Sequence, residues 1–273
     1  RGSYRSVPME TLVEEAGRLA EGGVRELILV AQETTVYGKD LYGRKALPEL
    51  LKRLCAIPGL YWIRLLYCYP EEITEELIET IRTEPKICHY LDMPIQHASD
   101  RILKKMGRKT NQQELRERIA RLREQIPDIC LRTTLISGFP GEEQEDFVTL
   151  YNFVDELEFD RLGVFAYSRE EGTVAADMPE QVPEEVKEAR RSELMELQQE
   201  IAFEKAQSMT GKTLVAMIEG RVDGENAYVA RTYMDAPNVD GLLFIHTSRE
   251  LMSGDFVRAR ITGAYEYDLI GEL

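Results

Sequence analysis

One unit recurs along this chain: a short apolar strand that ends in polar residues and is followed by a helix. Helical segments separate the strands, which are expected at residues 26–31, 61–67, 88–93, 130–136 and 161–167. Strands joined by single helical crossovers lie parallel in one sheet. No G-x-G-x-x-G sequence follows any strand, which disfavours a dinucleotide-binding fold. The pattern predicts an α/β fold, a TIM-like and partly open (β/α) barrel, with its site at the carboxyl ends of the strands.

The clearest unit is Leu131–Glu142. Its Leu, Thr and Ile residues predict a buried strand, and Ser137–Gly141 interrupts it before a helix with acidic residues in its first turn. Backbone amides in such a turn are accessible to a ligand, although an ordinary strand-to-helix turn has the same pattern. In the strand at residues 26–31 the apolar run predicts burial on both faces, as in a parallel sheet.

A second pattern begins after the linker 179–183. Residues 184–208 predict a long helix whose apolar stripe, Leu194, Leu197, Ile201 and Ala202, packs on the barrel. Five short strands follow at residues 213–219, 227–232, 242–245, 255–262 and 264–270, and glycines separate them. This spacing is typical of a small, oligomer-binding-like β-barrel. We therefore expect two domains, residues 1–207 and 208–273.

Composition restricts the function classes. No window is apolar and long enough to span a membrane. Cys55, Cys68, Cys88 and Cys130 lie far apart in apolar segments, so they are expected to be reduced, buried residues of a cytoplasmic protein, with no metal-ligand spacing. A shared metal site in neighbouring strands is the less favoured alternative. A net charge of −15 argues against general nucleic-acid binding and suits a basic protein partner.

Polar residues at the predicted strand ends are the candidate site. They should converge on one mouth of the barrel, with Arg1 beside it: Gln32, Glu33, Gln96, His97, Arg132 and Ser168. Each has a structural alternative. Glu33 is as well suited to capping its own turn, Arg132 to pairing with Glu33 or Asp92, and His97 to a structural role.

Three segments together carry a family resemblance: Ile28–Gly38 (ILVAQETTVYG), Leu91–Ser99 (LDMPIQHAS) and Ile136–Glu142 (ISGFPGE). In this order they resemble the radical S-adenosylmethionine (SAM) methylthiotransferases. The final segment resembles the TRAM domain of that family. The residues at 95–99 and 233–240 are most similar to the branch that modifies a ribosomal protein, and less similar to the tRNA-adenosine branch.

The resemblance implies a transferase that adds a methylthio group to the β-carbon of an aspartate in the twelfth small-subunit ribosomal protein, at the decoding centre. It implies SAM and two 4Fe–4S clusters as cofactors. This chain has no C-x3-C-x2-C sequence, and the family's cluster loop and first strand would precede Arg1. We therefore expect this segment to hold neither cluster and no other metal, and to be inactive alone.

The resemblance also implies roles for individual residues, although no catalytic residue is assigned. Gln32 and Glu33 would lie near the amino group of SAM, and Arg132 near its carboxylate. The other SAM-site candidates are Gln96, His97, Ile136, Gly138 and Phe139, of which Ile136, Gly138 and Phe139 would pack near adenine and ribose.

The charge of the C-terminal segment predicts the kind of partner that it binds. Residues 211–273 contain six basic and ten acidic side chains, so this domain should repel RNA and dock a basic ribosomal protein. Asp235 and Asp240 would flank an exposed loop that faces the substrate. Two rival classes stay open: a non-catalytic RNA-binding module, and a barrel hydrolase or isomerase that uses strand-end carboxylates such as Glu33 and Asp92.

Overall fold

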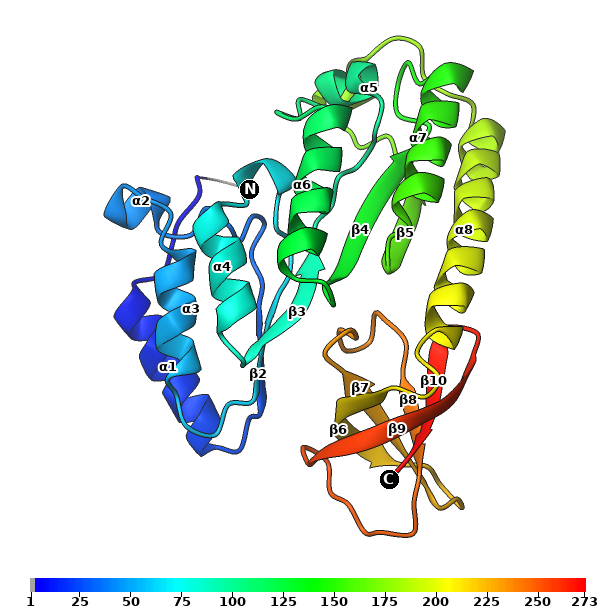
Figure 1. Ribbon diagram of the computed structural model, residues 1–273. Coiled ribbons are helices and arrows are strands. Elements are labelled where there is room, and N and C mark those ends of the chain that lie inside the picture. Colours follow the sequence, from blue (N-terminus) through cyan, green and yellow to red (C-terminus); the bar gives the residue numbers. More distant parts are fainter. Residues whose placement is uncertain (1–2) are drawn as a thin grey trace. The chain divides into compact units, whose positions relative to one another are not determined.

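A computed structural model describes residues 3–273, and these form two compact units. The first unit comprises residues up to 66, 74–90 and 202–273, and the second comprises residues 67–73 and 91–201. The division of the chain at residue 207 stays a prediction. The open sheet is parallel and has the strand order β1-β2-β3-β4-β5, which follows the chain (Figure 1).

In the first unit, helices alternate with strands as predicted. β1 (Glu26–Leu29) and β2 (Trp62–Leu65) pair in parallel, and β3 spans Ile87–Asp92. The helices are α1 (Met9–Glu21), the short α2 (Lys39–Tyr42), α3 (Leu47–Cys55) and α4 (Glu75–Thr83). Pro48 stands in the first turn of α3, and the Thr74 hydroxyl accepts the Leu77 amide at the start of α4. Only α2 was absent from the sequence prediction.

The predicted burial of β1 is wrong. All four of its residues are only partly buried, and Val30 just beyond it is 59% exposed. β1 lies at the edge of the sheet, so one side of the strand has no neighbouring strand among the described residues. An apolar run alone does not reveal whether a strand lies at the centre or the edge of a sheet.

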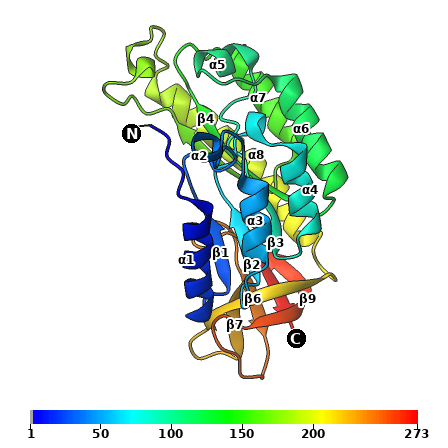
Figure 2. The same cartoon turned by 90° about the vertical axis from the view of Figure 1, so that its left-hand side faces the viewer.

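The C-terminal strands close into the small barrel that the sequence predicts. β6 (Thr213–Arg221), β7 (Ala227–Thr232), β8 (Leu243–His246), β9 (Phe256–Tyr265) and β10 (Asp268–Glu272) have the order β10-β8-β7-β6-β9 (Figure 2). The fifth predicted strand, residues 264–270, is misplaced. The chain turns at Glu266, where φ is +53°, so β9 runs on to Tyr265 and β10 starts only at Asp268.

Within the first unit, this barrel is anchored to β1 and β2 by a buried guanidinium. Arg64 on β2 is fully buried, pairs with Glu26 at 2.8 Å and donates to the main-chain oxygens of Thr232 and Tyr233. Arg231 of β7 pairs with the same Glu26 at 2.6 Å. A buried cation is tolerated only when its hydrogen bonds are made, so these contacts fix the barrel to the strands.

The predicted loop between Asp235 and Asp240 is exposed at Asn238 and Val239, whereas the two acids that flank it make internal hydrogen bonds. Asp235 is 2% exposed, and its carboxylate accepts hydrogen bonds from the amide and hydroxyl of Thr232. The Asp240 carboxylate accepts from the Tyr90 hydroxyl and the Ala236 amide. These two acids therefore build the loop and its contact with β3, and they do not present an exposed acidic surface.

The second unit contains β4 (Cys130–Ser137) and β5 (Arg161–Ala166), which pair in parallel. Its helices are α5 (Asp100–Lys105), α6 (Gln112–Gln125), α7 (Gln144–Leu157) and the 184–201 part of α8 (Glu184–Gln207). Short 3-10 turns lie at Pro70–Glu72 and Val174–Asp177. As predicted, the α8 stripe is buried; Leu194 is fully enclosed, and Gln198 beside it donates to Phe159 O at 2.9 Å. No helix within residues 3–273 is long and apolar enough to cross a membrane.

Candidate functional site

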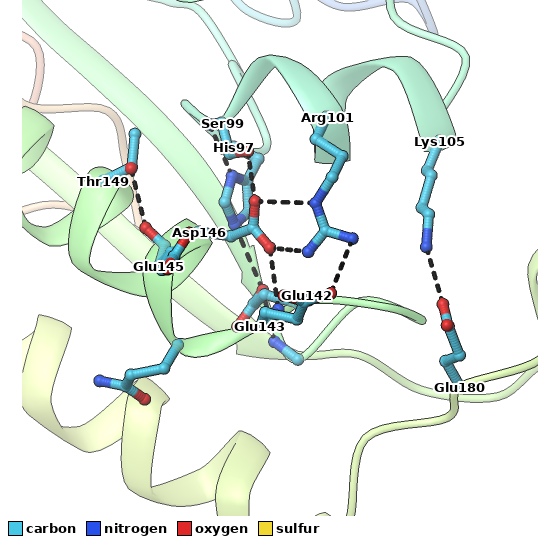
Figure 3. Close-up of polar contacts among 12 residues, drawn as sticks. His97, Ser99, Arg101, Lys105, Glu142, Glu143, Glu145, Asp146, Thr149 and Glu180 are labelled. Atoms are coloured by element: carbon cyan, nitrogen blue, oxygen red, sulfur yellow. Dashed lines mark hydrogen bonds and ion pairs between the residues drawn. The ribbon is translucent and has the colours of Figure 1, made fainter.

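Two of the motif segments bond to each other in the second unit. The His97 ring is fully buried after β3, and its Nε2 lies 3.3 Å from the Glu142 carboxylate, which follows β4 (Figure 3). The Ser99 amide donates to His97 Nδ1 at 2.9 Å, which leaves the ring proton on Nε2, facing Glu142. His97 therefore joins the loop after β3 to the loop after β4, which is the structural alternative weighed for it.

Glu142 is the centre of this arrangement. Its side chain has no exposed surface, accepts the Gly138 amide at 2.9 Å and pairs with Arg190 of α8 at 2.7 Å. The carboxylate thus closes the Ser137–Gly141 turn from within. Its negative charge is compensated by Arg190, which a buried carboxylate requires.

Asp146 fixes the start of α7 in the same region (Figure 3). It accepts the Ser99 hydroxyl at 2.6 Å and the Glu143 amide at 2.8 Å, and it forms an ion pair with Arg101 of α5. Burial alone raises the pKa of Asp146, but the hydrogen bonds from Arg101, Ser99 and Glu143 outweigh it, and the pKa is lowered. The strand-end loops are therefore held rigidly together.

Gly138 is fixed by packing. Its φ is +70°, and a Cβ there would lie 2.2 Å from Cγ of Lys187 on α8. Lys187 is itself buried, and its ammonium donates to Tyr167 O at 3.0 Å and to Glu184 at 2.9 Å. This turn accommodates only glycine, and α8 covers it.

Several buried polar atoms have no partner among the described residues, and two of them, Gln96 Oε1 and the Tyr167 hydroxyl, belong to the segments that follow β3 and β5. Gln96 has φ of +70° and joins the edge of β4 through bonds with Thr134 and Ile136. Buried polar groups are nearly always hydrogen-bonded in a complete site, so both atoms fit a ligand with donors or acceptors such as a nucleoside.

The other site candidates of the second unit contact neighbouring side chains of the same unit. Arg132 pairs with Asp92 at 2.9 Å, which is the alternative considered for it, and Asp92 also accepts the Tyr67 amide. Phe139 is 6% exposed and packs edge-on against Tyr167, with Ile136 beside this cluster. Ser168 is exposed and donates to Glu170. Whether these residues bind SAM stays a prediction.

In the first unit, Gln32 lines a cavity of about 530 Å³ at the end of β1, together with residues 3–7. Ser6 holds this N-terminal segment by bonds to Asp40 at 2.7 and 2.6 Å. The Glu33 carboxylate accepts the Thr35 amide and hydroxyl, so it caps its own turn, as its structural alternative states. Because the candidates belong to two units, their convergence on one mouth stays a prediction; Arg1 lies outside the described residues.

The cysteines do not form a ligand set for an iron–sulfur cluster. None of the four forms a disulfide; Cys68, Cys88 and Cys130 are buried, whereas Cys55 is only half-buried, contrary to prediction. Burial raises the pKa of the Cys88 thiol to about 12, against the lowering effect of Arg64. No group of three potential metal ligands occurs among residues 3–273. The side chains described here therefore do not fit a cluster, whereas Gln96 and Tyr167 fit a nucleoside.

Four residues that build this site were not among the candidates predicted from the sequence: Glu142, Lys187, Arg190 and Tyr167. Glu142 was seen only as part of a motif, and Lys187 and Arg190 were hidden in a charged helix. Tyr167 was recognised only as the end of a strand. A buried ion pair between residues 48 positions apart leaves no local sequence pattern.

Comparison with known proteins places these observations in a family. The radical SAM superfamily model matches residues 1–154, and the TRAM domain model matches residues 210–273. The "Ribosomal protein uS12 methylthiotransferase RimO" of Lachnoclostridium phytofermentans is 64% identical over 99% of this chain and 62% of its own length. The protein of the same name from Acetivibrio thermocellus is 52% identical over 100% of this chain and 60% of its own. The chain thus spans about three-fifths of these relatives.

A solved structure supports the predicted fold class. The crystal structure of methylornithine synthase (PylB) superposes with a TM-score of 0.50 at 15% identity, covering 72% of this chain and 55% of that one. At this identity the likeness concerns the fold alone. Together with the parallel sheet and the closed C-terminal barrel, it confirms a TIM-like barrel followed by a TRAM barrel. Because the radical SAM model matches more than half of its residues, the chain belongs to the radical SAM superfamily.

Proposed function

We propose that this chain is the barrel and TRAM portion of a radical SAM methylthiotransferase that acts on the β-carbon of an aspartate in ribosomal protein uS12. The observation that carries the proposal is the 64% identity, over 99% of the chain, to a relative named for that activity. The reaction would take place in the cytoplasm, where ribosomes are found.

The cofactors proposed are those of the family, SAM and two 4Fe–4S clusters, which together supply a carbon radical and the inserted sulfur. Cysteine ligands for the clusters would come from residues outside this chain, because no suitable set exists within it. The 273-residue chain alone should therefore be inactive.

Within the chain, the second unit would hold part of SAM. The Gln96 carbonyl oxygen would accept a hydrogen bond from the nucleoside, and the Tyr167 hydroxyl would satisfy another polar group. Arg132 would attract the carboxylate of SAM while Asp92 holds its guanidinium in place. Phe139 and Ile136 would exclude water beside them. His97, Glu142 and Gly138 would position these loops and would not touch the ligand, which revises the roles expected for His97 and Gly138.

Binding of SAM to the chain tests this part of the proposal without any turnover. We expect Gln96→Ala to weaken SAM binding in equilibrium dialysis about tenfold, the effect of about one hydrogen bond. Gln113→Ala on the exposed face of α6 is the matched control and should bind like the parent chain. Equal binding by Gln96→Ala would remove this residue from the site.

The TRAM barrel would dock uS12, since a protein that contacts ribosomal RNA is basic and residues 211–273 carry four more acidic than basic side chains. An observation favours RNA as the rival partner. Lys212 directly before β6, and Arg258 and Arg260 on the neighbouring β9, are exposed, and none has an acidic partner among the described residues. Titration of the chain with uS12 and with a tRNA stem-loop at matched salt decides between them; tighter binding of the RNA would favour the tRNA branch.

The activity itself is tested in a chimera. The chain replaces the matching 62% of the Lachnoclostridium phytofermentans relative, the clusters are reconstituted, and uS12 is examined by mass spectrometry. We expect a methylthio group on one aspartate. A reconstituted chimera that leaves uS12 unchanged but modifies tRNA adenosine would assign the other branch.

A further inference from the structure

The outer edge of β5 offers unpaired main-chain groups. β5 is the last strand of the sheet, so no strand lies beyond it among residues 3–273. The Tyr167 amide donates to Ser137 O, so Gly163 and Phe165 in β5 likewise direct their main-chain groups toward β4. Val164 and Ala166 therefore direct their N–H and C=O groups away from β4. Within the described part of the chain, these main-chain groups have no hydrogen-bond partner.

A groove follows this edge. A cavity of about 490 Å³ is lined on one side by residues 164–169 and on the other by Glu184, Lys187, Glu188 and Arg191 of α8. Phe165, the second-last residue of β5, is 63% exposed beside it. Exposed strand edges are normally blocked or covered, because they bind other strands. The groove leaves this edge open.

The charge around the groove selects the kind of partner. Glu170 and Glu171 in the loop after β5, and Glu184 and Glu185 at the start of α8, are exposed. Of the three lining cations, Lys187 and Arg191 are each paired with a carboxylate of the same helix, Glu184 and Glu188. The third, Arg169, is exposed and donates to Ala176 O, so the five acidic residues around the groove, including Glu188, outnumber its three cations. Such surroundings attract a basic chain.

We propose that an extended basic segment of the protein substrate adds to the outer edge of β5 as an additional strand. Val164 and Ala166 supply the main-chain hydrogen bonds, Phe165 contacts an apolar side chain, and the acidic residues attract Lys and Arg. The groove includes Tyr167 and Ser168, at the carboxyl end of the strand, where the site of the second unit lies. The inference rests on the proposed function, since it takes the substrate to be a polypeptide.

Hydrogen exchange on the 273-residue chain, with and without uS12 from Lachnoclostridium phytofermentans, tests the inference directly. We expect exchange of the Val164 and Ala166 amides to slow at least tenfold at saturating uS12. The Ala166→Pro variant removes one outward donor and no bond to β4, so the fold should survive. It should weaken uS12 binding about tenfold, the effect of about one hydrogen bond.

The matched control is Ala166→Val, which keeps the amide and suits a strand; it should bind uS12 like the parent. Binding of uS12 with unchanged exchange at residues 162–167 and no effect of Ala166→Pro overturns this inference alone. Self-association of the chain that Ala166→Pro abolishes also overturns it, because the edge then binds a second copy. Failure of the proposed function is recognised separately, by the chimera leaving uS12 unmodified.

Discussion

Arg190 Nη1 lies 2.7 Å from the Glu142 carboxylate, and the two side chains are 9% and 0% exposed. This ion pair joins α8 to the turn after β4, and the same carboxylate faces His97 and the Gly138 amide. One buried charge therefore holds three segments of the second unit together.

Glu142→Gln should destabilise the chain by about 3 kcal/mol, because it leaves Arg190 buried without an opposite charge. The amide has the same shape and can still accept a hydrogen bond, so the loss reports mainly the charge. Urea unfolding measures it. Glu145→Gln, an exposed neighbour on α7, is the control and should change stability by less than about 0.5 kcal/mol. If the two variants lost the same free energy of unfolding, the Glu142–Arg190 ion pair would not contribute to stability as we expect.

Gly138→Ala should destabilise the chain much more than Gly172→Ala. The two glycines have similar φ values, +70° and +78°, but a Cβ at residue 172 meets nothing within 4 Å. The second variant therefore measures the conformational cost, about 1 kcal/mol, and the difference measures the clash with Lys187. Thermal unfolding of both variants provides the comparison. Lys187→Ala removes the closest atom, Cγ, and should partly rescue Gly138→Ala, whereas no rescue would place the clash elsewhere.

Asp146 should contribute stability that depends on pH. Its pKa is lowered from the usual 3.8, so the folded state favours the carboxylate. This contribution is complete well above pH 3.8 and is lost as the pH falls through the folded-state pKa. The free energy of unfolding of the wild type should therefore exceed that of Asp146→Asn at about pH 6. The difference should shrink below about pH 4, which is roughly the pKa of an unperturbed carboxyl group. Asp155→Asn, an exposed change on the same helix, should give no such convergence.

The thiols of Cys88 and Cys55 should be unreactive in the folded chain. Burial raises their pKa values to about 12 and about 11, so the thiolate is scarce at pH 8. We expect Ellman's reagent to modify both far more slowly than free cysteine, with full reactivity in urea. Rapid modification of Cys88 in the native chain would show that its strand opens.

The repeated pattern was sufficient to predict nearly every helix and strand, because apolar periodicity, caps and glycines are local. Asn111 and Glu114, for example, form the capping box that starts α6. Edge position is not local, and so β1 was wrongly expected to be buried on both faces. A turn without glycine, at Glu266, likewise displaced the last strand.

For the site, sequence identified the loops but not the partners of their side chains. Glu33 bonds to Thr35 and Arg132 to Asp92, both of which were considered, but the Glu142–Arg190 pair required α8 to be placed on the sheet. Counting charges also overestimated the acidity of the barrel surface, because Asp235 is buried and bonds to Thr232. A net charge describes a surface only after the buried acids have been subtracted.

The hydrogen bond from Arg64 to the Tyr233 oxygen joins residues 169 positions apart. During synthesis on the ribosome, Arg64 therefore emerges long before the main-chain acceptors that it needs. At about 5–20 residues per second, this guanidinium would wait roughly ten seconds or more for these acceptors, with only its Glu26 partner already synthesised. The N-terminal strands should thus remain a substrate for chaperones until the last barrel strand has left the exit tunnel, and a premature stop in the barrel should expose them to proteolysis.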